Sequence, residues 1–153
     1  MKALLLFVAL AGVAAAQQID KIVYFGPGMS SSLANGAKSA SAIGGGKLVF
    51  HLGTGGWFSQ LSCSASYVMP QTTGAKNYWS MRPSVTLGYR FRRGKSRFST
   101  YGGFGETRNR IGDFLPTAVG GVIVKLKGHW GFLADVSRNA QSWGSSTTLG
   151  YRF

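Results

Sequence analysis

The chain has 153 residues, with 17 lysines and arginines against 4 aspartates and glutamates, so its formal net charge is +13. This length fits one domain, and the single cysteine, Cys63, excludes an internal disulfide and any multi-cysteine metal site. Such a basic balance predicts association with an anionic surface, but the beginning of the chain argues against nucleic acid as the partner.

The first 16 residues have the pattern of a cleavable secretory signal. Lys2 precedes an apolar run over residues 3–13, and three small residues, Ala14, Ala15 and Ala16, stand before Gln17. The run is shorter than the roughly 20 apolar residues of a bilayer-spanning helix, which disfavours an N-terminal anchor. We therefore predict a signal peptide over residues 1–16 and one mature domain over residues 17–153.

The mature segment favours an all-β fold. Its 23 glycines are spread along the chain, and its alternating segments never hold a 3.6-residue period for three turns. Alternation and turn residues predict eight strands, over residues 19–25, 42–52, 57–68, 79–91, 97–105, 117–126, 130–137 and 146–153.

The connections are expected to alternate in length. Short glycine-bearing turns are predicted at 53–56, 92–96 and 127–129, and long polar loops at 26–41, 69–78, 106–116 and 138–145. This alternation is typical of a meander barrel in a membrane, where short turns face the periplasm and long loops face outward.

The last strand shows the two faces most clearly, since Leu149, Tyr151 and Phe153 share one side and Gly150 and Arg152 share the other. A soluble barrel could give the same period with its apolar side inward. Aromatic residues near both strand ends favour an outward apolar side with two belts. The predicted belt at the short turns contains Trp57, Tyr89, Phe91, Phe98, Trp130, Phe132, Tyr151 and Phe153, and the other contains Tyr24, Tyr67, Tyr78, Trp79 and Phe104. The facing of the first and fifth strands stays open.

With its export signal, strand count, loop alternation and terminal Leu149-x-Tyr151-x-Phe153 pattern, the chain resembles the small bacterial outer-membrane β-barrels of the OmpA/OmpX type, including opacity-type proteins. The resemblance implies an eight-stranded antiparallel up-and-down transmembrane β-barrel in a Gram-negative outer membrane. It also implies that Leu149, Tyr151 and Phe153 form the signature read by the outer-membrane assembly machinery. A monomer is expected, and function stays open because fold does not determine it.

The interior of an eight-stranded barrel is just wide enough for side chains to fill. We therefore expect a closed or barely leaky lumen with a polar network of Arg82, Arg90, Asp135 and Glu106. Asp135 would neutralise a lumenal arginine, and Glu106 would serve Arg82 or Arg108.

Further cations are predicted on the external loops, where lipopolysaccharide phosphates offer charge-assisted partners. They are Lys76, Arg108, Arg110 and Arg138.

Three functions fit these features. The first is an integral barrel with a structural, envelope-integrity or surface-interaction role, without catalysis or a large pore. The second is a soluble, secreted barrel that binds a hydrophobic ligand. The third is an outer-membrane enzyme that modifies lipid A, which is disfavoured because His51 and His129 lie near short turns, away from Glu106 and Asp113. No metal or cofactor is expected, because two distant histidines and one cysteine cannot form a tetrahedral site.

Overall fold

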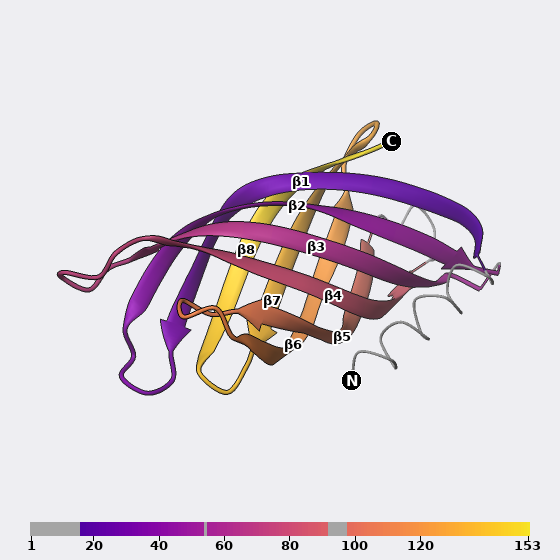
Figure 1. The fold of residues 1–153 in the computed structure, drawn as a ribbon. Coiled ribbons are helices and arrows are strands. Elements are labelled where there is room, and N and C mark those ends of the chain that lie inside the picture. The colour runs from indigo at the N-terminus through magenta and orange to yellow at the C-terminus, as the bar shows by residue number, and fades with distance from the viewer. Residues whose placement is uncertain (1–15, 54, 92–97) are drawn as a thin grey trace.

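The computed structural model describes residues 16–53, 55–91 and 98–153, and within them the chain forms one closed antiparallel barrel (Figure 1). Residues 1–15 of the predicted signal and the predicted turn at 92–96 lie outside the described residues. Among the described residues, no helix is long and apolar enough to cross a membrane. The strands are β1 (Ala16–Ser32), β2 (Lys38–Leu52), β3 (Trp57–Pro70), β4 (Tyr78–Arg90), β5 (Phe98–Arg108), β6 (Phe114–Lys125), β7 (Trp130–Arg138) and β8 (Ser142–Arg152).

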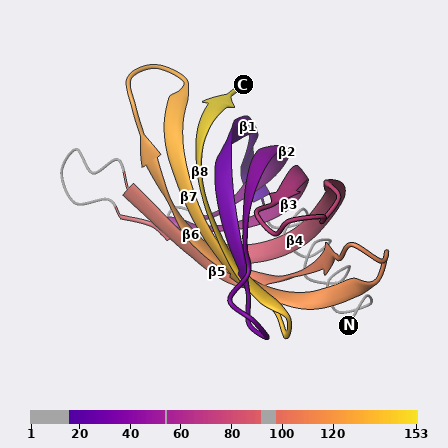
Figure 2. The same ribbon diagram turned by 90° about the vertical axis from the view of Figure 1, so that its left-hand side faces the viewer.

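Each strand pairs with the next, and β1 closes the ring by pairing with β8 (Figure 2). Following paired residues once around the wall from Lys21 returns to Ser31, ten residues farther along β1. With about 3.3 Å per residue and about 4.8 Å between strands, that stagger tilts the strands by about 40° from the barrel axis. Each residue then advances about 2.5 Å along the axis.

The barrel has two ends that differ in their connections. We call the end with the start of β1, the end of β8 and the turns at 53–56 and 126–129 the terminal mouth. The far mouth carries the connections at 33–37, 71–77, 109–113 and 139–141, which lie together at the left-hand end of the barrel in Figure 1.

The predicted eight strands are confirmed, but the predicted contrast between short turns and long loops is wrong. The far-mouth connections have three to seven residues, because the strands continue into the segments predicted as loops. Ser30, Ser39 and Ser41 all line the cavity inside the far mouth. These strand ends carry serine on one side and residues such as Met29 on the other, so their composition resembles that of a loop. Their serines in fact face the barrel interior.

The predicted facing is confirmed on β3, β4, β6, β7 and β8. On β4, for example, Leu87 is exposed while Ser84 and Thr86 are buried inside. The structure also settles the two open strands. In β1 Tyr24 is buried and Phe25 is exposed, and in β5 Tyr101 is buried while Phe104 is exposed.

Glycines in the wall make room for the large interior rings. Tyr24 lies beside Gly45 on β2, and a Cβ at Gly45 would be 2.6 Å from the tyrosine hydroxyl. Tyr101 lies beside Gly121 on β6, where the corresponding distance would be 2.7 Å. These two glycines therefore allow the rings to pack closely against the wall.

Candidate functional site in the barrel lumen and on its outer wall

The outer wall of the barrel is apolar and exposed. Phe25, Trp79 and Phe104 expose 63%, 66% and 67% of their surface. Between Trp79 and Tyr89, the outward residues of β4 are Met81, Pro83, Val85 and Leu87. An exposed apolar surface of this extent marks an interaction with a membrane or another protein.

Aromatic rings form a belt around the terminal mouth, as predicted. Ring centroids lie 5.2 Å apart for Trp57 and Tyr89, 5.4 Å for Tyr89 and Phe91, 5.6 Å for Phe91 and Phe98, and 5.1 Å for both Trp130–Tyr151 and Tyr151–Phe153. Because these rings come from β3, β4, β5, β7 and β8 and neighbouring residues, the belt follows most of the circumference.

The second belt is confirmed in part. Tyr67 and Trp79 contact each other on the outer wall, with centroids 5.2 Å apart, and Trp143 is exposed on β8. Three residues predicted there lie elsewhere. Tyr24 is buried in the interior, Tyr78 lines the far-mouth cavity, and Phe104 pairs with Val85 in the middle of the outer wall. Tyr24 lies in the middle of β1, whose facing the sequence left open, and Tyr78 is the first residue of β4.

The distance between the belts can be worked out from the strand geometry. Trp57 and Tyr67 are ten residues apart on β3, as are Trp79 and Tyr89 on β4. At about 2.5 Å of axial advance per residue, ten residues span about 25 Å. This is the height of the apolar band between the aromatic girdles of transmembrane barrels.

A buried ion pair lies at the centre of the lumen. Lys47 Nζ is 3.3 Å from Asp135 Oδ1, and the side chains are only 3% and 5% exposed. Lys47 also donates to the Tyr101 hydroxyl at 2.8 Å, and that hydroxyl donates to Asp135. The ammonium group lies 4.4 Å from the centroid of the Tyr101 ring and 5.3 Å from that of Tyr24, where cation–π attraction adds to the pairing.

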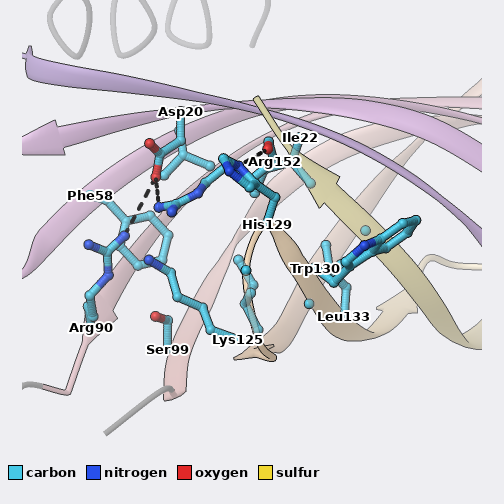
Figure 3. Close-up of a pocket in the computed structure, with 15 residues that line it drawn as sticks. Asp20, Ile22, Phe58, Arg90, Ser99, Lys125, His129, Trp130, Leu133 and Arg152 are labelled. Carbon is cyan, nitrogen blue, oxygen red and sulfur yellow. Dashed lines mark hydrogen bonds and ion pairs between the residues drawn. The ribbon is translucent and has the colours of Figure 1, made fainter. Parts of the chain in front are cut away.

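A second cluster surrounds Asp20 at the terminal mouth (Figure 3). Asp20 Oδ2 lies 2.9 Å from His51 Nε2, 3.4 Å from Arg152 Nη1 and 3.9 Å from Arg90 Nη2. Arg90 Nη2 is also 3.4 Å from His51 Nε2. An ionised carboxylate only accepts hydrogen bonds, so His51 Nε2 donates to Asp20 in this contact and cannot also accept from Arg90.

Side chains packed in mid-barrel separate two cavities. Phe58, near the terminal mouth, and Leu133 are fully buried, in one cluster with Tyr24 and Tyr101. The terminal-mouth cavity, drawn in Figure 3, has a volume of about 40 Å³, and the far-mouth cavity has about 530 Å³. The packed cluster between them fits the prediction of a filled interior.

The structure brings only part of the predicted lumenal network together. Arg82 faces the far-mouth cavity, Arg90 joins the Asp20 cluster, and Asp135 pairs with Lys47 instead of an arginine. Glu106 lies on the outer face of β5 with Phe104, because the buried residues of this strand are at odd positions.

The predicted external cations lie at the far mouth, and the residues of the assembly signature lie on the last strand. Arg108 and Arg110 line the far-mouth cavity, Lys76 is exposed in the connection after β3, and Arg138 is exposed at the end of β7. Leu149 and Tyr151 alternate with the buried Thr148 and Gly150, so they lie on the outer face of β8.

Sequence reasoning missed the two residues that complete these clusters, Lys47 and Asp20. Lys47 follows three glycines in a strand whose facing the sequence did not make clear, and Asp20 lies on β1, whose facing was open. Strict alternation with Val49 and His51 would have placed Lys47 inside.

No protein-family profile and no curated protein matches this chain. Two solved structures are similar. One, described as "De novo design of transmembrane beta-barrels", has 13% identity and a TM-score of 0.55, covering 90% of this chain and 99% of that one. The other, described as "Solution NMR structure of de novo designed TMB2.3", has 15% identity and a TM-score of 0.49, covering 90% of this chain and 98% of that one. At this identity the first likeness shows the shared barrel fold.

Proposed function

We propose that this chain is an integral outer-membrane β-barrel protein with a structural, envelope-integrity or surface-interaction role. Its interior is packed shut, so that it forms no large pore. The proposal includes export through the signal at residues 1–16 and insertion as a monomer.

The observation that carries this proposal is the inverted arrangement of polar and apolar side chains. Lys47, Asp135 and Asp20 are buried inside the barrel, whereas Phe25, Trp79 and Phe104 are exposed outside. A soluble barrel that binds a hydrophobic ligand needs the reverse, since water would contact the outer wall. The two aromatic belts, about 25 Å apart, support a hydrocarbon layer between them.

Tryptophan quenching tests the proposal, because Trp57, Trp79, Trp130 and Trp143 are all exposed. The protein is refolded into phosphatidylcholine vesicles whose acyl chains carry bromine at a shallow or a deep position. We expect strong quenching, and more from the shallow bromines, because the tryptophans lie in the belts. Quenching by neither lipid would contradict the proposal and favour the soluble barrel.

A matched control fixes the depth scale. Val85 lies between Trp79 and Tyr89 on the outer face of β4, so a variant with Val85→Trp and the four native tryptophans replaced by phenylalanine carries one ring in mid-wall. We expect deep bromines to quench this variant most. If shallow bromines quench it equally, the belts do not mark the edges of a hydrocarbon layer.

We further propose that the role is non-catalytic. His51 donates to Asp20, and His129 Nδ1 lies 2.8 Å from the carbonyl oxygen of Arg152, so both rings are engaged at the terminal mouth. The non-catalytic role would be overturned if the wild type deacylates lipid A or transfers palmitate to it and the His51→Ala variant does not. The variant must also be shown to fold, by heat-modifiable migration in a gel.

The proposed partners follow from location. Arg138 and Lys76 lie near the rim of the far mouth, where the phosphates of lipopolysaccharide would contact them. Leu149, Tyr151 and Phe153 would be recognised by the assembly machinery, since Leu149 and Tyr151 face outward on the last strand.

A further inference from the structure

The far-mouth cavity is a chamber built by the whole barrel. All eight strands contribute residues to its lining, and its volume is about 530 Å³. This volume falls within the range of about 300–1,000 Å³ found for small-molecule sites. It is also far larger than the terminal-mouth cavity of about 40 Å³.

The lining of this cavity combines apolar side chains with hydroxyl groups and a positive charge. Arg82, Arg108 and Arg110 line it together with serine hydroxyls, such as those of Ser41 and Ser66. None of the described residues that line it is an aspartate or a glutamate. The ion pairs of the described residues also leave these three arginines without a carboxylate partner.

The three arginines lie at different depths. Arg82 is half-buried on β4 and pairs with Ser64, which pairs with Gly45, which in turn pairs with Tyr24, so it lies in the same row as the central cluster, on the floor of the cavity. Arg108 ends β5 on the same side of the strand as Phe104 and Glu106, so its guanidinium lies at the outer rim beside Gly112. Arg110 lies in the following turn. Asn109 Oδ1 holds that turn by accepting from the backbone N–H groups of Ile111 at 3.1 Å and Asp113 at 2.9 Å.

The central ion pair does not neutralise this floor. Asp135 is matched by Lys47, so the guanidinium of Arg82 remains as excess positive charge inside a wall of low dielectric constant. Walls of this kind focus the field of a charge and raise the local concentration of the opposite ion.

We propose that the far-mouth cavity binds a small phosphorylated polyol, with phosphate on the arginines and hydroxyl groups on the serines. Guanidinium groups bind phosphate oxygens in pairs, and hydroxyl side chains both donate to and accept from sugar hydroxyls. This inference goes beyond the proposed envelope role and does not depend on it, since the cavity is formed within the barrel.

The test uses the full mature barrel, refolded into phosphatidylcholine nanodiscs at constant ionic strength. Calorimetric titrations with glucose 6-phosphate and with inorganic pyrophosphate measure binding, and glucose is the uncharged control. We expect both phosphates to bind and glucose to bind at least tenfold more weakly. Equal affinity for glucose and glucose 6-phosphate would overturn the proposal.

Matched variants locate the site. Arg82→Met removes the cation on the floor, and Lys76→Met removes an equal charge at the same mouth from a residue outside the lining. We expect Arg82→Met to weaken glucose 6-phosphate binding about tenfold or more, since the phosphate loses its charge-assisted hydrogen bonds to the guanidinium. We expect Lys76→Met to change it less than twofold. Equal losses in both variants would mean that general charge attraction, and no built site, holds the phosphate.

Two further arms complete the test. Arg110→Met alters an exposed turn residue, so it stays informative if Arg82→Met fails to fold, and it too should weaken binding. Nanodiscs containing phosphatidylglycerol distinguish a free solute from a lipid headgroup. An unchanged affinity supports a soluble ligand, whereas competition by this lipid in the wild type but not in Arg82→Met assigns the cavity to a lipid phosphate.

Discussion

The central Lys47–Asp135 pair gives the sharpest stability prediction, because it lies in the middle of the packed lumen. The two charges are 3.3 Å apart and nearly inaccessible to solvent. At an effective dielectric constant of about 20, their attraction is about 5 kcal/mol. Asp135→Ala removes the carboxylate and leaves a buried ammonium whose remaining described contacts are the Tyr101 hydroxyl and two aromatic rings.

We expect Asp135→Ala to lower the free energy of unfolding by about 3–5 kcal/mol, the usual cost of leaving one buried charge unpaired. Urea titration in lipid vesicles, followed by tryptophan fluorescence and by gel migration, measures the change. The triple variant Lys47→Met, Tyr101→Phe, Asp135→Leu removes all three polar groups, so it should recover most of the loss. A loss below about 1 kcal/mol for Asp135→Ala would refute the reasoning, since the pair would then be hydrated and the lumen open.

Three other changes test the packing, the outer wall and the terminal signature by the same titration or by assembly yield. Gly45→Ala places a Cβ 2.6 Å from a tyrosine hydroxyl and should lower the free energy of unfolding by about 1–3 kcal/mol. Gly46→Ala, whose Cβ would have its nearest atom at 3.8 Å, should change that free energy by no more than about 0.5 kcal/mol. Val136→Arg changes a residue that is 60% exposed, yet in a membrane it should lower the free energy of unfolding by about 2–4 kcal/mol. Ala34→Arg, in a far-mouth connection, is its control. Equal effects of the two variants would contradict a lipid-facing wall. Phe153→Ala should reduce assembly in cells more than refolding in vesicles, and an equal reduction of both would argue against a recognition signature.

The sequence predicted the number of strands and most of their facing for a simple physical reason. A strand alternates its side chains with period two, and β4 follows this pattern closely. The strands β3, β7 and β8 follow it with exceptions, such as the buried Phe58 and Leu133 and the exposed Thr147. Strand ends were harder, because serine and glycine occur both in loops and on the polar inner side of a barrel. Ser30 and Ser39 therefore looked like loop residues, and the predicted loop lengths were wrong as a result.

The lumenal clusters could be predicted only in part, because their partners come from distant strands. Asp135 and Lys47 are 88 residues apart in the chain, and Asp20 and Arg152 are 132 apart. Alternation can place each of these side chains inside, but the pairing depends on the stagger of ten residues around the wall. Local sequence carries little information about that stagger, so the partner of Asp135 could not be chosen correctly.

A membrane barrel requires an outer wall that faces hydrocarbon, and the single native cysteine allows a direct test of this wall. Cys63 is exposed on the outer face of β3, six residues from Trp57 and four from Tyr67, and its neighbour Ser64 is buried inside. A nitroxide on Cys63 in the vesicle-bound protein should collide more often with oxygen, which concentrates in hydrocarbon, than with a polar nickel chelate. A control label in the connection after β3, at Thr73→Cys in a Cys63→Ser background, should show the opposite preference. If the label on Cys63 prefers the nickel chelate as strongly as the control does, the wall faces water and the account is contradicted.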